Sequence, residues 1–377
     1  MRLTDEGGTP DSAVADAGSS GLPGRQARLC GSLIGTAMGD AIGLPYEGLS
    51  RRRAARLLGA PTRQRLFFGR GMVSDDTEHA CMTAQALIIS GGDVAAFRKN
   101  LASRLRWWLL PLPAGVGLAT ARAILRLWLG ISPEKSGVFS AGNGPAMRAP
   151  IIGAAIDDVQ ALRPLVRVCT RLTHTDEKAE FGALAAALAA HMAARQIRVA
   201  GADFLAQLKT LLAGEGGEFL ALMEAAVKSV GQGQTTQDFA AALGLERGVS
   251  GYMLHTLPVV IQAWLTHQSD FRAAITAIVE CGGDTDSTAA ILGGIVGASC
   301  GPAGIPADWQ GGLLEWPRSI RWMTRLGRAL GRAQAQGPVA GVKQRAPELF
   351  FPVVLLRNVF FLGVVLFHGF RRLLPPY

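Results

Sequence analysis

The sequence predicts an all-α protein. Alanine- and leucine-rich stretches with helical spacing recur along the chain, as in EFGALAAALAAHMAARQ at residues 180–196, whereas the alternating pattern of strands hardly appears. Turns rich in glycine and proline separate these stretches, as in PLPAG at 111–115 and LAGEGGEF at 212–219. Together these observations favour a bundle of helices joined by short turns.

Composition narrows the class of protein. Of the 377 residues, 49% are hydrophobic and 18% are charged, which is the balance of a folded globular chain. The formal charge of +9 favours anionic partners such as phosphates, nucleic acid or an acidic membrane face. The five cysteines include no C-x-x-C pair, so neither a disulfide framework nor a zinc ribbon is indicated. A reducing cytoplasm fits this cysteine usage best.

Four segments are expected along the chain. Residues 1–27 are rich in small and polar residues and lack the apolar core of a signal peptide, so they predict a disordered arm. Residues 28–330 form the helical body, which carries every motif described below. Residues 331–348 are typical of a linker, and residues 349–377 form an apolar helical tail.

Two acidic blocks each precede an apolar helix, SDDT at 74–77 and GGDTDSTAA at 282–290. Adjacent carboxylates repel one another, and folded proteins usually keep such crowding only where cations compensate it. Oxygen ligands without cysteine indicate a hard ion, Mg²⁺ or Mn²⁺, and two such blocks can form a two-metal site. The candidate ligands are Ser74, Asp75, Asp76, Asp284, Asp286 and Ser287.

Helix capping is the structural alternative for these blocks. Serine, threonine and aspartate are preferred N-cap residues, and acids in the first turn complement the helix dipole. For either block alone, capping is the favoured interpretation. For the two together, metal binding is favoured, because capping needs one oxygen and each block offers two carboxylates.

Two further stretches combine glycines with polar side chains. In GSLIGTAMGDAIGLPYEGL at 31–49, glycines recur every fourth residue, which predicts the close approach of another helix. Asp40 and Glu47 would be costly on such a packed face unless they point into a polar cavity. The stretch SAGNGPAMRAP at 140–150 can present backbone N–H groups to an anion, with Arg148 as a charged donor, or can be an ordinary helix entry.

In this order, the four stretches resemble the ADP-ribosylglycohydrolase family between residues 28 and 300, and the paired acidic blocks are specific to that family. The resemblance implies an all-α orthogonal helical bundle with two Mg²⁺ or Mn²⁺ ions at the base of an ADP-ribose cleft. The six side chains of the acidic blocks are then the metal ligands, with Ser287 where threonine is common. The catalytic acid or base is left open among Glu47, Asp76 and Asp284.

The stretch GNGPAMR is similar to the loop with which the family contacts ADP-ribose. Pro145 departs from the usual pattern and removes one backbone N–H. Arg148 is expected either to contact the ligand or to form a structural ion pair, and His174 either faces the cleft or is a cap or surface residue. The residues that the resemblance assigns to substrate binding are Gly142, Asn143, Gly144, Met147, Arg148 and His174.

The implied reaction is hydrolysis of an N- or O-glycosidic bond at the anomeric carbon of ADP-ribose, on a modified protein or a small molecule. A non-catalytic ADP-ribose-binding or structural relative is the alternative, but such a relative would have lost metal aspartates and none is lost. Seven arginines between Arg51 and Arg70 raise the possibility of nucleic-acid binding. Few aromatic residues accompany them, so no specific nucleic acid is expected.

The tail lies outside the resemblance. Its uninterrupted apolar stretch, 359–367, is shorter than the about 20 residues of a spanning helix, although a tilted span stays open. On a helix Arg357, His368, Arg371 and Arg372 would share one side. The tail can therefore lie in a membrane interface with its arginines at lipid phosphates, self-associate, or pack on the body. Packing is favoured, with a cytoplasmic or peripherally membrane-bound enzyme and a tail dispensable for catalysis.

Overall fold

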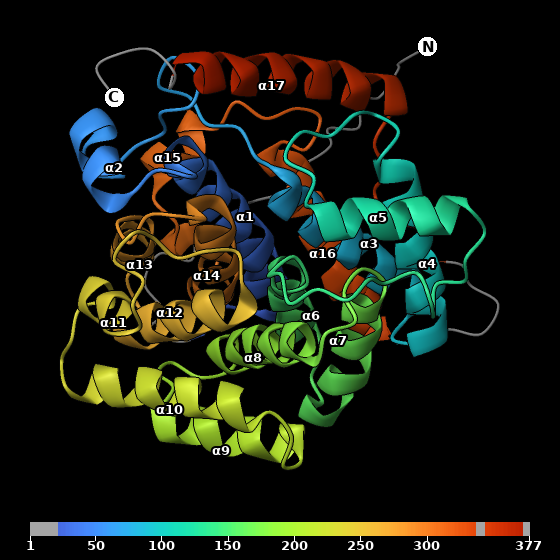
Figure 1. Cartoon of the computed structure of the whole chain (residues 1–377). Helices are drawn as coiled ribbons and strands as arrows, with labels where there is room; N and C mark the ends of the chain where they lie inside the picture. Colours follow the sequence, from blue (N-terminus) through green and yellow to red (C-terminus); the bar gives the residue numbers. More distant parts are fainter. Residues whose placement is uncertain (1–21, 337–343, 372–377) are drawn as a thin grey trace, which may run out of the picture.

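Helices make up nearly all of the regular structure (Figure 1). The structure is a computed structural model that describes residues 22–336 and 344–371, and these ranges contain no strand beyond isolated bridges. The prediction of an all-α fold is confirmed. The α-helices are α1 (Arg25–Gly43), α2 (Arg51–Leu58), α3 (Asp75–Ser90), α4 (Val94–Trp108), α5 (Leu118–Trp128), α6 (Ala149–Ala155), α7 (Leu162–Arg171), α8 (Glu177–Ala193), α9 (Gly201–Leu212), α10 (Gly217–Gly231), α11 (Thr236–Ala242), α12 (Met253–Thr266), α13 (Phe271–Val279), α14 (Thr285–Cys300), α15 (Ala307–Gly312), α16 (Ile320–Gln336) and α17 (Phe351–Arg371).

The central pair of helices, α1 and α14, lies antiparallel with the two backbones in contact (Figure 1). A Cβ atom on Gly31 would lie 2.1 Å from the carbonyl oxygen of Gly297, and one on Gly43 would lie 2.2 Å from that of Thr285. The two glycines between them are equally close to α14. The predicted close approach is confirmed, and it sets the end of α1 beside the start of α14.

Small residues also allow α6 and α8 to pack closely beside this central pair. A Cβ atom on Gly153 of α6 would lie 1.9 Å from the carbonyl oxygen of Ala187 in α8. The alanine-rich α8 is buried along its whole length after Lys178. Its outer side is covered by α9 and α10, which form one edge of the molecule (Figure 1). The core is therefore held rigidly around the ends of α1 and α14.

The segment boundaries differ in part from those expected. Helix α1 begins at Arg25, within the expected arm 1–27, and residues 1–21 lie outside the described residues. Helix α16 runs to Gln336, so the first residues of the expected linker 331–348 are helical. It continues because Gly331 and Ala333 are still buried against the body. Residues 337–343 lie outside the described part of the chain.

The tail forms α17, a 21-residue helix that lies across one end of the bundle (Figure 1). Among the described residues it is the one helix whose length and hydropathy would suffice to cross a membrane. The basic side of the tail is expected to point outward, but Arg357 does not, so that expectation is wrong for it. It is buried in the protein, because the carboxylates of Glu78 and Glu315 lie next to its charge. Arg371 is exposed, and Arg372 lies outside the described residues.

Candidate active site

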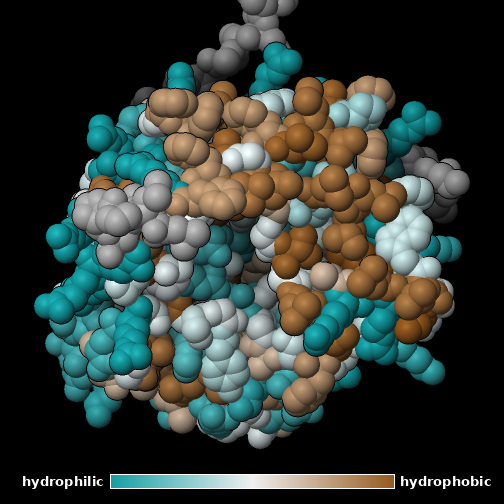
Figure 2. Space-filling view, turned by 45° about the horizontal axis from the view of Figure 1, so that its top comes forward, coloured by the Kyte–Doolittle hydropathy of each residue, from teal (hydrophilic) through white to brown (hydrophobic). Residues whose placement is uncertain are grey.

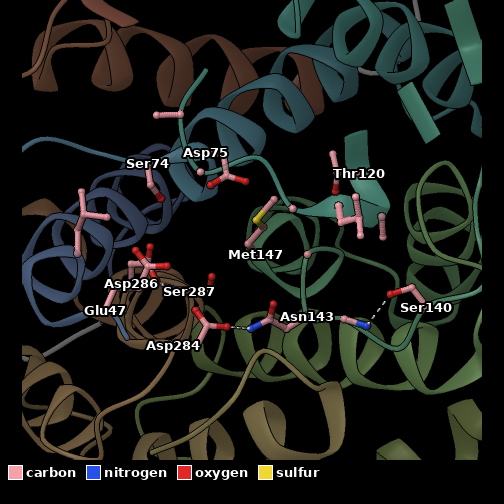
Figure 3. Close-up of a pocket in the computed structure, with 18 of the residues that line it drawn as sticks. Glu47, Ser74, Asp75, Thr120, Ser140, Asn143, Met147, Asp284, Asp286 and Ser287 are labelled. Atoms are coloured by element: carbon pink, nitrogen blue, oxygen red, sulfur yellow. Dashed lines mark hydrogen bonds between the residues drawn. The ribbon is translucent and has the colours of Figure 1, made fainter. Parts of the chain in front are cut away.

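A cleft of about 400 Å³ lies where the end of α1 meets the starts of α3 and α14. Residues of both acidic blocks and of the glycine-rich loop line it (Figure 3). His174 lines it as well. Asp76 and Arg148 do not line it, and both are almost fully buried. The residues assigned from the sequence that do line the cleft are Glu47, Ser74, Asp75, Gly142, Asn143, Gly144, Met147, His174, Asp284, Asp286 and Ser287.

The start of α3 is capped by residues other than its aspartates. The Ser74 hydroxyl accepts a hydrogen bond from the Asp76 backbone N–H at 3.3 Å. Asp40 of α1 accepts the Ser74 N–H at 2.9 and 3.0 Å and the Thr77 hydroxyl at 2.6 Å. Because Asp40 and Ser74 meet the free N–H groups, the carboxylates of Asp75 and Asp76 are not required as caps.

The start of α14 is shaped by a turn at Gly282 and Gly283, whose φ angles of +74° and +87° favour glycine. A Cβ atom on Gly283 would also lie 2.1 Å from the carbonyl oxygen of Val249, so no side chain fits there. Asp284 holds the N-cap position, yet its side chain forms no capping hydrogen bond. The capping alternative therefore does not account for the carboxylate of Asp284.

The two acidic blocks are joined at Asp76. The hydroxyls of Ser74 and Ser287 donate to Oδ2 of Asp76 at 3.1 and 3.2 Å, which joins α3 to α14. The other oxygen, Oδ1, is buried without a hydrogen-bond partner. Burial raises the pKa of Asp75, Asp76 and Asp286 well above the usual range, and the neighbouring carboxylates raise it further.

This donor set fits a hard divalent cation. Carboxylate and hydroxyl oxygens are the ligands that Mg²⁺ and Mn²⁺ prefer, and Asp76 offers an unpartnered buried oxygen. Within the described ranges, no three His, Cys, Asp or Glu side chains are already grouped as a formed metal site. Cation binding would therefore involve side-chain rotations that bring carboxylates from the two helix starts together.

Asp40 lies just behind the acidic blocks and supports them. It is fully buried, and its carboxylate bonds hold the start of α3 against the end of α1. Burial raises its pKa to about 7, while the hydrogen bonds from Thr77 and Ser74 act in the opposite direction. Asp40 was expected to need polar surroundings. These hydrogen bonds supply them, and the open cleft does not.

The glycine-rich loop is tied directly to the second acidic block. The Asn143 amide donates to Oδ2 of Asp284 at 2.8 Å and to the Thr256 hydroxyl at 3.1 Å (Figure 3). Its backbone N–H donates to the carbonyl oxygen of Gly251 at 2.9 Å. Asn143 therefore fixes both the loop and the orientation of one candidate metal ligand.

His174 lies against this loop, and Arg148 lies behind it. A Cβ atom on Gly142 or Gly144 would come within 3.2 Å of the His174 ring, so both glycines make room for it. The Thr173 hydroxyl bonds the ring at 2.9 Å and accepts a hydrogen bond from Arg148 at 2.8 Å. Burial and, as the smaller cause, the charge of Arg148 lower the pKa of His174 to about 3.

The assignment of Arg148 to ligand binding is corrected by its position. Its guanidinium is fully buried and contacts His79 at 3.2 Å and the carbonyl oxygen of Cys169 at 3.1 Å. It turns away from the cleft because these acceptors, with Thr173, surround it. Of the two expected roles, the structure favours the structural one, although the partners are neutral rather than acidic.

A buried ionic network lies one turn further along α3. Glu78 accepts from Trp108 and from Arg318, the latter at 2.6 Å, and Arg357 of α17 lies 3.5 Å away. Arg357 also pairs with Glu315 at 2.7 Å and donates to the Val73 carbonyl at 2.5 Å. The tail is thereby anchored directly behind the first acidic block.

Several other residues of the cleft were not assigned from the sequence. Thr120 and Ser140 are polar residues of its wall, and Phe361 and Val365 of α17 close one side. The last two are four residues apart on a helix, which is a signal that they share a face. The tail therefore belongs to the wall of the cleft, and the expectation that it is dispensable for catalysis stays a prediction.

Comparison with known proteins agrees with this architecture. The sequence model of the ADP-ribosylglycohydrolase family matches residues 22–338. The ADP-ribosyl-[dinitrogen reductase] glycohydrolase of Rhodospirillum rubrum is 27% identical over 302 residues, covering 78% of this chain and 93% of that protein. ADP-ribosylhydrolase ARH3 of Homo sapiens is 25% identical over 336 residues, covering 75% and 88%.

The fold agrees as well. A solved ADP-ribosylglycohydrolase-related protein complex contains a chain that superposes with a TM-score of 0.63 at 26% identity, covering 82% of this chain and 99% of that one. The match confirms the predicted type of helical bundle, and the family match ends before α17. The chain therefore belongs to the ADP-ribosylglycohydrolase family of hydrolases.

Proposed function

We propose that this protein is a metal-dependent hydrolase that removes ADP-ribose from a modified protein or a small molecule by cleaving the glycosidic bond at the anomeric carbon. One observation carries the proposal above the others. Carboxylates from two helix starts, which form no ion pair with a basic side chain of the described residues, line the same cleft as the glycine-rich loop and are joined to it by Asn143 and Asp284.

The two acidic blocks would hold the cations. Asp75 and Asp286 line the cleft, Asp284 is oriented by Asn143, and Asp76 contributes from beneath through its unpartnered oxygen. When bound, Mg²⁺ or Mn²⁺ lowers the pKa of a coordinated water and polarises ribose hydroxyls. The same cations would relieve the repulsion between these buried carboxylates, which the chain itself leaves uncompensated.

The chain's own residues would orient the substrate between the two ends of the cleft. The acidic end suits the ribose that carries the scissile bond, since its hydroxyls are neutral donors to carboxylates. The loop end is uncharged, with Ser140, Thr120 and His174 on its wall, and suits the remainder of the nucleotide. The lowered pKa of His174 keeps its ring neutral there, so it can accept or donate a hydrogen bond without adding charge.

Among the three carboxylates left open by the sequence, we assign proton transfer to Glu47. Asp76 does not line the cleft, and Asp284 is engaged by Asn143. Glu47 lines the cleft and is exposed, so its carboxylate can exchange protons with solvent. It would accept a proton from the water that attacks the anomeric carbon and return it to the departing nitrogen or oxygen.

Turnover of defined substrates tests this function. The full-length protein, with Mg²⁺ or Mn²⁺, should release ADP-ribose from at least one of a panel of arginine-linked, serine-linked and O-acetylated ADP-ribose compounds. Glu47→Gln should lower kcat by about 10²–10⁴-fold with little change in ADP-ribose affinity. The matched control, Glu246→Gln at another exposed position, should retain full activity.

The alternative, a non-catalytic relative, predicts a different result in the same assay. Wild-type protein that binds ADP-ribose in calorimetry yet releases none from any substrate, with either metal, would support it. A cytoplasmic location remains our proposal, and it accords with five cysteines that are all unpaired, four of them buried.

A further inference from the structure

Helix α17 buries two polar side chains beside its inward apolar ones and leaves large apolar side chains exposed on its outward side. Its polar residues Arg357 and Asn358 are 1% and 0% exposed, and His368 bonds the backbone carbonyl of Leu66. A surface helix of a soluble protein normally turns its apolar stripe inward and its polar residues outward. The outward side chains that are more than half exposed are Leu356, Val359, Leu366, Phe367 and Phe370.

A neighbouring turn extends this surface. Phe68 is 93% exposed at the tip of the turn from Phe67 to Arg70, where its φ of +47° holds the ring out from the body. Phe67 packs edge-on against Phe360 of α17, with ring centroids 5.3 Å apart. We call the outward side of α17 together with Phe68 the apolar face. Figure 2 shows apolar side chains gathered in a band across this side of the molecule.

Basic side chains accompany the C-terminal part of the apolar face. Arg65 and Arg371 line a groove of about 700 Å³ between α17 and the turn that carries Phe68. Helix α2, which carries exposed arginines at 51, 52, 53 and 56, lies near the same end of α17 (Figure 1). No aspartate or glutamate lines this groove within the described residues. The combination of exposed aromatic rings and arginines is typical of surfaces that enter a lipid interface.

From the exposed apolar side chains of α17 and the arginines beside them, we infer that the apolar face docks on an anionic lipid bilayer, with α17 lying flat in the interface. Lipid supplies what the outward side chains need, an apolar medium next to a layer of phosphates for the arginines. A second copy of the chain is the less suitable occupant, because pairing these faces would bring two arginine-bordered surfaces of the same charge together.

The buried side of α17 argues against a helix that spans the bilayer. Arg357 pairs with Glu315 and Glu78, and Asn358 donates to the carbonyl oxygen of Pro111 at 2.9 Å. Insertion across the membrane would break all of these contacts and expose charges to hydrocarbon. The helix is therefore expected to bind lipid while it remains packed on the body.

Docking in this orientation has a consequence for the cleft. Phe361 and Val365, on the flank of α17, line the cleft, and Leu118 of α5, 65% exposed, lines it as well. The cleft therefore lies directly beside the apolar face, and docking would bring it close to molecules at the membrane surface. That consequence rests on the proposed function, whereas lipid binding itself does not.

Vesicle sedimentation tests the docking with the full-length protein. Wild type should sediment with vesicles of phosphatidylcholine and phosphatidylglycerol, and less with phosphatidylcholine alone or at high salt. Phe367→Glu should weaken partitioning about tenfold or more, and Arg371→Ala about fivefold. The matched control Ile197→Glu, at a 74% exposed position between α8 and α9, should bind as wild type does. Circular dichroism and thermal midpoints verify that each variant is folded.

Four outcomes would overturn the inference. The first is folded wild type that sediments with neither kind of vesicle, and the second is Phe367→Glu that binds as tightly as wild type. Light scattering could instead reveal a dimer that Phe367→Glu dissociates, which would identify a second copy as the occupant. Protein that resists extraction from the vesicles by alkaline carbonate would show insertion across the bilayer. None of these results depends on hydrolase activity, so they leave the proposed function to its own assay.

Discussion

The first turn of α3 carries carboxylates in opposite electrostatic surroundings. Asp75 and Asp76 face further carboxylates, and the pKa of each is raised well above the usual range by burial and by this repulsion. Two residues after Asp76, Glu78 is met by Arg318 at 2.6 Å and by Arg357 at 3.5 Å. The same helix therefore carries one acidic group that the chain neutralises and one that it does not.

The difference separates structural acids from functional ones. A buried carboxylate is normally paired, because an isolated charge in a protein interior is costly. Glu78 pairs with Arg357 of α17 and with Arg318, which precedes α16. Its charge is therefore neutralised within the fold. Asp75 and Asp76 have no arginine or lysine partner among the described residues. Their carboxylates therefore retain a requirement for an external cation. Each prediction below tests one side of this comparison.

Removal of Arg357, which pairs with Glu78, should have the largest effect on stability. Arg357→Ala leaves Glu78 and Glu315 buried with too little positive charge and should lower the free energy of unfolding by about 3–5 kcal/mol. Urea denaturation followed by circular dichroism measures this change. Arg321→Ala, at an exposed position of α16, is the control and should change stability by about 0.5 kcal/mol or less. Equal effects of the two variants would show that the network contributes nothing to stability.

Metal addition should act on Asp75, Asp76 and the carboxylates near them, and not on Glu78. In the metal-free protein, Mg²⁺ or Mn²⁺ at about 100 times its dissociation constant should stabilise the fold by about 2.7 kcal/mol, because the folded state binds it. Asp75→Asn should remove most of this stabilisation while leaving the metal-free protein at least as stable as wild type. Differential scanning calorimetry with and without metal measures both effects. Asp203→Asn, at an exposed position of α9, serves as control. A metal response that survives in Asp75→Asn would remove this residue from the ligand set.

The smallest expected effect is on pH dependence in the presence of a chelator. Because the pKa of Asp76 is raised in the folded state, its contribution to stability is complete below the unfolded value of about 3.9 and is lost as the pH rises. Asp76→Asn keeps an acceptor for the two serines but carries no charge. The variant should therefore gain thermal stability relative to wild type between pH 4 and 7, by about 2 °C or more. A difference that is constant with pH would show that the repulsion is absent.

The parts of the fold that rest on local patterns could be predicted from the sequence. Glycines at every fourth position of α1 predicted that another helix would approach it closely, and the two acidic blocks predicted that they would act together at one site. Partners far apart in the chain could not be predicted. Asp40 caps a helix that starts 35 residues later, and Arg357 pairs with an acid 279 residues earlier. Neither pairing leaves a periodic signal, so the inward direction of Arg357 became visible only in three dimensions.

The contact between α1 and α14 also restricts how the site can vary. Where two backbones touch through glycines, no side chain remains between them whose size could adjust their separation. The two helices can only be displaced along each other from one glycine to the next, four residues or about 6 Å. Such a step would carry Asp284 and Asp286 away from α3 by more than the length of any hydrogen bond. The distance between the two acidic blocks can therefore take only discrete values. Substitutions of the glycines between α1 and α14 should either leave this distance unchanged or abolish the site, without intermediate distances.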